Sequence, residues 1–136
     1  MYGLGAYGSM IADRVRVEAY AEALRKSVRK GSVVAESGTG PGIFAVLACQ
    51  LGATRVYAIE PSEIIQVARE VAAANGCADK IEFFEELSDR VMLPGRADVI
   101  LSDLRAALAD PLNGKRTKIK ARTASNRCGR GRRWRA

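Results

Sequence analysis

Three glycines spaced two residues apart stand between two apolar segments near the middle of the chain. Gly38, Gly40 and Gly42 follow residues 32–36, which have the composition of a buried strand, and precede residues 43–51, which have that of a buried helix. Glycine accepts positive φ and lets a ligand approach the backbone. The start of the following helix presents free N–H groups and the positive end of its dipole. The pattern therefore predicts a strand–loop–helix corner that binds a nucleotide-like ligand.

The segments around this corner alternate between helical and strand patterns, which favours a parallel sheet with helices on both faces. After a flexible lead over residues 1–8, we expect a first helix over residues 9–28. A second strand is expected over residues 55–60, followed by a helix that begins at Pro61-Ser62-Glu63 and ends near Asn75-Gly76. Further strands are expected over residues 80–85 and 97–102, with a polar connection over residues 87–96. The predicted fold class is α/β, a Rossmann-like domain over residues 1–110.

The charge is distributed unevenly along the chain. The net charge is +7, yet residues 1–110 carry twelve basic and fifteen acidic side chains, whereas residues 111–136 carry ten basic and no acidic ones. The last segment is also poor in apolar residues, so we predict a disordered basic tail. Such a tail could bind nucleic acid, with Trp134 stacking on a base; the alternative, which its composition favours, is a solvated tail without a function.

Other compositional features exclude several classes of site. The chain has no histidine, and its three cysteines, Cys49, Cys77 and Cys128, show neither metal-ligand spacing nor a disulfide framework. We therefore expect no metal site and a reducing, cytoplasmic setting. No apolar run reaches the roughly 20 residues of a membrane helix, and no secretory signal is expected.

Two acidic residues flank the glycine loop at the ends of the first two predicted strands. Glu60 ends the second strand, where its carboxylate oxygens could accept from both hydroxyls of an adenosine ribose; the alternative is a solvent-facing glutamate. Glu36 precedes the loop, where it could attract the ammonium group of a cofactor or hold the loop by hydrogen bonds. A dinucleotide site requires a third glycine at Ile43, so the pattern favours S-adenosylmethionine over the cofactor of a dehydrogenase.

The segment GSVVAESGTGPGIFAVLACQLGATRVYAIEPS resembles motif I and the following acidic strand of class I S-adenosylmethionine-dependent methyltransferases. Upstream, Tyr7-Gly8, Met10, Asp13 and Arg16 stand in an order similar to that of the protein arginine methyltransferase group. The resemblance covers about residues 7–108 and is most specific for the cofactor site.

The resemblance implies a role for each matching residue. Arg16 would pair with the carboxylate of the cofactor, and Tyr7 and Met10 would cover it as a lid. The glycines of the loop would contact its methionine portion, and Glu60 its ribose. Ser88 and Asp89, after the third strand, would lie near the adenine. The alternatives are ordinary helix packing for Met10, a solvated charge for Arg16, and loop positions without a ligand for Ser88 and Asp89.

The chain departs from that family in its substrate region. Asp103 stands at about the position of the first of two glutamates that grip a substrate guanidinium, and no second carboxylate follows in a comparable hairpin. Only four strands of the usual seven are predicted, and the family's C-terminal barrel has no counterpart. The fourth strand should therefore form an open edge that could pair with another chain. The loss of pattern after Leu108 indicates a truncated or frame-shifted version of a longer relative.

The leading functional hypothesis is an S-adenosylmethionine-dependent methyltransferase that transfers a methyl group to protein arginine or a similar nitrogen acceptor. Asp103 would then orient the acceptor. The alternatives are an inactive fragment of a cofactor domain and a nucleic-acid-binding module that acts through the basic tail.

Overall fold

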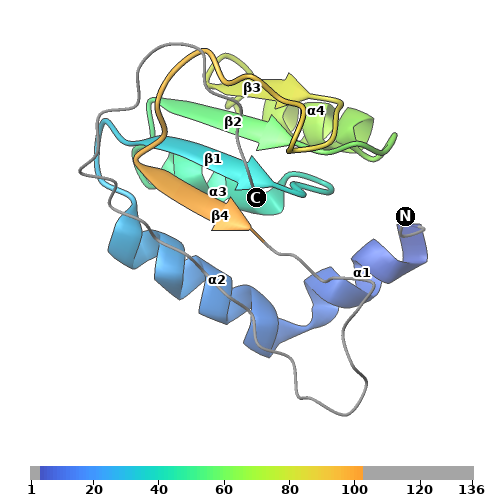
Figure 1. Cartoon of the computed structure of the whole chain (residues 1–136). Helices are drawn as coiled ribbons and strands as arrows, with labels where there is room; N and C mark the ends of the chain where they lie inside the picture. The colour runs from blue at the N-terminus through green and yellow to red at the C-terminus, as the bar shows by residue number, and fades with distance from the viewer. Residues whose placement is uncertain (1–3, 103–136) are drawn as a thin grey trace.

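The computed structural model describes residues 4–102, which form a four-stranded parallel sheet (Figure 1). The strands are β1 (Val33–Ser37), β2 (Arg55–Ile59), β3 (Ile81–Phe84) and β4 (Val99–Ser102), in the spatial order β3-β2-β1-β4. The chain thus moves outward from β1 to β3 and then returns to place β4 on the other side of β1. Such a reversal is the point at which open α/β sheets bind ligands, beyond the carboxyl ends of their strands. The predicted α/β, Rossmann-like fold is confirmed.

The first helical region contains two helices, α1 (Leu4–Ala12) and α2 (Arg14–Ser27). The predicted single helix over residues 9–28 is therefore wrong, as is the predicted flexible lead from Leu4 onward. Asp13 separates the helices because it caps α2: its backbone lies outside the helical region, at φ −72° and ψ 88°, and its carboxylate accepts a hydrogen bond from Arg16 N at 3.1 Å. Short acidic side chains favour this capping position over the interior of a helix.

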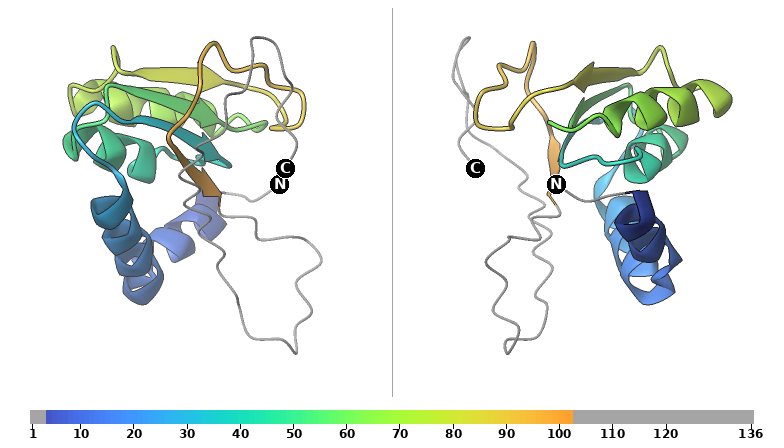
Figure 2. Two further views of the ribbon diagram at one scale, coloured as in Figure 1. Left: turned by 60° about the vertical axis from the view of Figure 1, so that its left-hand side comes forward. Right: turned by 90° about the vertical axis from the view of Figure 1, so that its right-hand side faces the viewer.

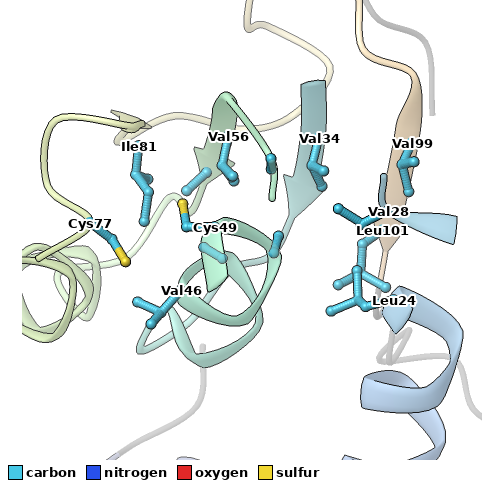
Figure 3. Packing of buried hydrophobic residues seen from close by; sticks show 14 of the residues in the cluster. Leu24, Val28, Val34, Val46, Cys49, Val56, Cys77, Ile81, Val99 and Leu101 are labelled. Atoms are coloured by element: carbon cyan, nitrogen blue, oxygen red, sulfur yellow. The ribbon is translucent and has the colours of Figure 1, made fainter. Parts of the chain in front are cut away.

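The helices α2, α3 (Ile43–Gln50) and α4 (Ile65–Ala74) pack on one face of the sheet, where they enclose the main apolar core (Figures 2 and 3). The prediction of helices on both faces is wrong for the described residues. Two right-handed crossovers that step in the same direction, from β1 to β2 and from β2 to β3, place α3 and α4 on the same side.

The return from β3 to β4 passes over the opposite face of the sheet and forms turns instead of a helix (Figure 2). The polar connection expected over residues 87–96 is therefore confirmed. A Cβ atom added to Gly95 would lie 2.9 Å from the hydroxyl oxygen of Tyr57, so the connection reaches the middle of β2. On β2, Val56 and Ala58 belong to the core on the helical side, whereas Tyr57 alternates to the other side and is also buried. Burial on both faces is typical of parallel strands.

Among residues 4–102, β4 pairs with β1 alone, which confirms the predicted edge position of the fourth strand. The predicted tail, residues 111–136, and the domain boundary at residue 110 lie outside the described residues. Within the described part of the chain, no helix has the length and apolar character needed to cross a membrane.

Candidate functional site

The glycine loop lies at the carboxyl edge of the sheet and arches over the end of β2. Gly38, Gly40 and Gly42 all have positive φ, at 75°, 54° and 81°. The backbone N–H groups of Gly38 and Thr39 both donate to the carbonyl oxygen of Ile59, at 2.8 and 3.0 Å. These two hydrogen bonds attach the loop, which follows β1, to the end of β2.

Glu60 is buried, with 6% of its surface exposed, and its carboxylate binds the loop to the segment after β2. Its Oε2 accepts from Gly40 N at 3.1 Å, and its Oε1 accepts from the backbone N and the hydroxyl of Ser62, at 3.1 and 2.7 Å. These bonds hold residues 61–64 in turns, so α4 begins at Ile65 rather than at the predicted residues 61–63. One acceptor position remains on Oε2, because a carboxylate oxygen has two lone pairs.

Glu36 lies on β1, next to β2 and 4% exposed. The hydroxyl of Thr39 donates to its Oε2 at 2.6 Å. Burial raises the pKa of Glu36 to about 7, and the nearby charge of Glu60 acts in the same direction, while the bond from Thr39 opposes both. Desolvation disfavours the charged form of a carboxyl group, whereas a donated hydrogen bond favours it.

Gly42 has a packing role in addition to its place in the loop. A Cβ atom at this position would lie 2.9 Å from the Cβ atom of Ala68 on α4, which is closer than real Cβ atoms approach. Gly38 has a similar positive φ but open space around the position of a Cβ atom. The absence of a side chain at Gly42 therefore lets α3 and α4 approach each other directly behind the loop.

Arg16 is connected to the start of α3 through two aromatic rings. Its guanidinium carbon lies 5.2 Å from the centroid of the Tyr20 ring, which in turn lies 5.0 Å from that of Phe44. Phe44 is in the first turn of α3, two residues after Gly42. The structure thus brings Arg16 to the side of α2 that faces the loop. Sequence analysis overlooked Tyr20 and Phe44; the four-residue spacing of Arg16 and Tyr20 on one helix was the available signal.

The structure gives fewer contacts for the other residues that the sequence analysis assigned to the site. Ser88 and Asp89 lie in a turn after β3, at the same edge of the sheet, where Arg90 N donates to Leu87 O at 2.9 Å. Ser88 is half-buried and Asp89 is exposed. The backbone of Tyr7 and Met10 belongs to α1, but their side chains lie outside the described part of the structure, as does all of Asp103.

Ser102 is a polar residue at this edge that sequence analysis did not single out. It ends β4 beside Ser37 of β1, and its hydroxyl oxygen is buried without a hydrogen-bond partner among residues 4–102. Only the structure reveals it, because the sequence does not show which serine of a strand end is covered. Among the described residues, no cluster of three or more acidic, cysteine or histidine side chains could hold a metal ion.

Comparison of the sequence with known proteins identifies methyltransferases as its relatives. A family model described as ribosomal protein L11 methyltransferase (PrmA) matches residues 18–126. The protein arginine N-methyltransferase PRMT10 of Oryza sativa subsp. japonica is 42% identical over 96 residues, which are 69% of this chain and 25% of that protein. This chain thus spans about a quarter of the length of such curated relatives.

Two solved structures extend the likeness to three dimensions. Protein arginine methyltransferase 10 of Arabidopsis thaliana has a TM-score of 0.70 and 35% identity, over 74% of this chain and 29% of that one. The Trypanosoma brucei PRMT1 enzyme-prozyme heterotetrameric complex with AdoHcy has a TM-score of 0.70 and 28% identity, over 74% and 32%. Since the family model matches well over half of its residues, the chain belongs to the PrmA family of methyltransferases, with the class I fold shared by the protein arginine methyltransferases that it resembles.

Proposed function

We propose that the chain binds S-adenosylmethionine at the carboxyl edge of its sheet and serves methyl transfer to a nitrogen of protein arginine. Its family membership and its arginine methyltransferase relatives support the reaction class. The relative solved with AdoHcy, the demethylated product of this cofactor, supports the cofactor class.

The observation that carries the proposal is the pair of buried carboxyl groups at the glycine loop, one on β1 and one directly after β2. Glu36 and Glu60 are 4% and 6% exposed, and neither forms an ion pair within the part of the chain that the structure describes. A buried carboxylate without a cationic partner is costly. S-adenosylmethionine carries two positive centres, a sulfonium and an ammonium, together with two ribose hydroxyls that donate hydrogen bonds. The donor and acceptor groups of this corner therefore fit that cofactor.

The structure refines the role proposed for Glu60. Sequence analysis assigned both of its oxygens to the ribose, yet Oε1 already accepts two bonds from Ser62. In the present arrangement, Oε2 can accept one ribose hydroxyl beside Gly40 N. A second bond, to Oε1, requires the hydroxyl of Ser62 to turn away.

The other roles follow from position along the same edge. Glu36 faces the cofactor's ammonium group, while Arg16, which stands over Tyr20, pairs with its carboxylate. The backbone of Gly38 and Gly40 contacts the methionine portion of the cofactor. Gly42 lies where the loop ends and α3 begins. Tyr7 and Met10 as a lid, and Ser88 and Asp89 beside the adenine, remain part of the proposal.

The cofactor supplies an electrophilic methyl group, and the chain's contribution is to hold an acceptor nitrogen in line with it and away from water. Asp103, which directly follows β4, is proposed to orient that acceptor by accepting its N–H bonds. A partner strand at the β4 edge and a cytoplasmic setting also belong to this proposal. Nucleic-acid binding through residues 111–136 stays a separate prediction, because that segment lies outside the described residues.

Calorimetric titration of the purified chain with S-adenosylmethionine tests the proposal. We expect saturable 1:1 binding, and a loss of at least tenfold in affinity for Glu60→Ala. Glu63→Ala is the matched control, because Glu63 is an exposed glutamate three residues away. Since Glu60 also holds Ser62, thermal melting must show that each variant is folded. A folded wild-type chain that does not bind the cofactor would reject the proposal.

A methylation assay with an arginine-rich peptide then separates binding from transfer. Transfer that is lost in Asp103→Ala, with cofactor affinity unchanged, would support Asp103 as the acceptor-orienting residue. Binding without transfer would show that the chain holds the cofactor and needs further protein for the reaction.

A further inference from the structure

Thr39 is a buried polar residue of the glycine loop, between Gly38 and Gly40. Only 5% of its surface is exposed. Its backbone N–H donates to the carbonyl oxygen of Ile59 at 3.0 Å, and its own carbonyl oxygen accepts from Gly42 N at 3.0 Å. The backbone of Thr39 is therefore held on both sides, and its β-branched side chain has few rotamers.

The hydroxyl of Thr39 forms a short hydrogen bond with the carboxyl group of Glu36. It donates to Oε2 at 2.6 Å, a length typical of hydroxyl groups that bind an ionised carboxylate. The next residue, Gly40, donates its backbone N–H to Oε2 of Glu60 at 3.1 Å. Two consecutive residues of the loop thus each donate to one of the two buried carboxyl groups.

Opposing effects set the charge of Glu36. Burial raises its pKa to about 7, the bond from Thr39 acts against this rise, and the charge of Glu60 adds to it. The residues beside Glu36 on β2 and β4 are an alanine and a leucine, and α3 contains no Asp, Glu, Lys or Arg. Arg16 is the cationic residue that α2 brings to the side facing the loop. Among these neighbours, Thr39 is the one that donates a hydrogen bond to the Glu36 carboxylate.

We propose that Thr39 is a positioning residue for cofactor binding: its hydroxyl group holds the carboxylate of Glu36 in the charged form that attracts the ammonium group of S-adenosylmethionine. This inference rests on the proposed function. Thr39 acts through Glu36 and need not contact the cofactor. An ionised carboxylate attracts an ammonium group, whereas the protonated acid offers it no counter-charge. The affinity for the cofactor should therefore increase as the pH rises through the range in which Glu36 ionises.

Three substitutions separate the hydroxyl group from the shape of the side chain. Thr39→Val has nearly the same shape but lacks the donor, so Glu36 should stay protonated to a higher pH. Thr39→Ser keeps the donor and removes a methyl group. Glu36→Gln removes the ionisation itself, so its pH profile shows any titration of the cofactor alone.

Calorimetric titration of the full chain and each variant with S-adenosylmethionine at pH 6, 6.5, 7 and 7.5 tests the proposal. The wild-type affinity should rise steeply below pH 7 and more gradually above it, because Glu36 ionises there. Thr39→Val should bind roughly tenfold or more weakly at pH 7, since it lacks a hydrogen bond to a charged group, and its rise should be displaced to higher pH. Thr39→Ser should keep the wild-type profile, and Glu36→Gln should lose the rise.

Thermal melting shows whether each variant is folded. A folded Thr39→Val protein with wild-type affinity, or with an affinity lower by the same factor at every pH, would overturn the role of Thr39, because a purely structural effect does not follow the ionisation of Glu36. Equal pH profiles for wild type and Glu36→Gln would also overturn it, and this comparison does not require Thr39→Val to fold. In these cases the wild type still binds, so the proposed function stands; a folded wild-type chain that does not bind the cofactor would reject both.

Discussion

Glu36→Gln should remove most of the pH dependence of folding stability between pH 4.5 and 7. Burial raises the pKa of Glu36 from its ordinary value of 4.5 to about 7. Between these values the folded chain keeps a proton that the unfolded chain releases, so the stability falls as the pH rises. The contribution of Glu36 is fully present below pH 4.5 and is lost as the pH rises through 7.

The size of this effect follows from the shift in pKa. Each pKa unit corresponds to 1.36 kcal/mol, so a change from 4.5 to about 7 is worth on the order of 3 kcal/mol in the free energy of unfolding. For a domain of this size, that amounts to a fall in Tm of more than about 10 °C. Glutamine has nearly the same shape and still accepts the bond from Thr39, but it does not ionise. At pH 8 the variant should therefore be the more stable protein, by about the same amount.

Urea unfolding of both proteins at pH 5, 6, 7 and 8 measures this difference. The background is favourable because the chain has no histidine to titrate in this range. Thr39→Val is the matched control: it removes the hydrogen bond that lowers the pKa of Glu36 and should move the loss of stability to higher pH. Equal pH slopes for wild type and Glu36→Gln would refute the assignment of this proton to Glu36.

Four further substitutions test the local geometry by thermal melting and urea unfolding. Gly42→Ala should lower stability by about 2–3 kcal/mol, because its Cβ would lie 2.9 Å from that of Ala68, whereas Gly38→Ala, with the same positive φ in open space, should cost only about 1 kcal/mol. Asp13→Ala should cost about 1 kcal/mol by removing the cap of α2, and an unchanged Tm would contradict that role. Ser102→Ala should leave stability unchanged or raise it by about 1 kcal/mol, since its hydroxyl is buried without a partner in the described part of the chain; a clear fall would reveal a partner instead.

Local patterns predicted the elements that position the site. The strand–loop–helix corner, the parallel sheet and the edge position of β4 were all predicted from short segments of the sequence. The apolar periodicity failed to predict the helix boundary at Asp13. In the sequence, an aspartate that caps a helix cannot be distinguished from a charged residue on the surface of a continuous helix. The expectation of helices on both faces also failed for the described residues, because the return to β4 is a polar connection that forms turns.

The finer features of the site depend on contacts between distant residues, which periodicity does not encode. Glu60 was singled out at its strand end, but its bonds to Gly40 and Ser62 depend on how the loop folds back over β2. The packing of Gly42 on Ala68 likewise needs the tertiary structure.

The charges of the corner distinguish between the two adenosine cofactors that the glycine loop could hold. A dinucleotide would bring a doubly negative pyrophosphate to the start of α3, and the backbone amides there favour an anion. Here, however, Gly40 N in the loop before α3 already donates to the buried carboxylate of Glu60, and Glu36 lies buried on β1. In its ionised form Glu36 would repel a pyrophosphate, whereas it would gain a counter-charge from a sulfonium or an ammonium. Glu36 thus favours the cationic cofactor over the anionic one.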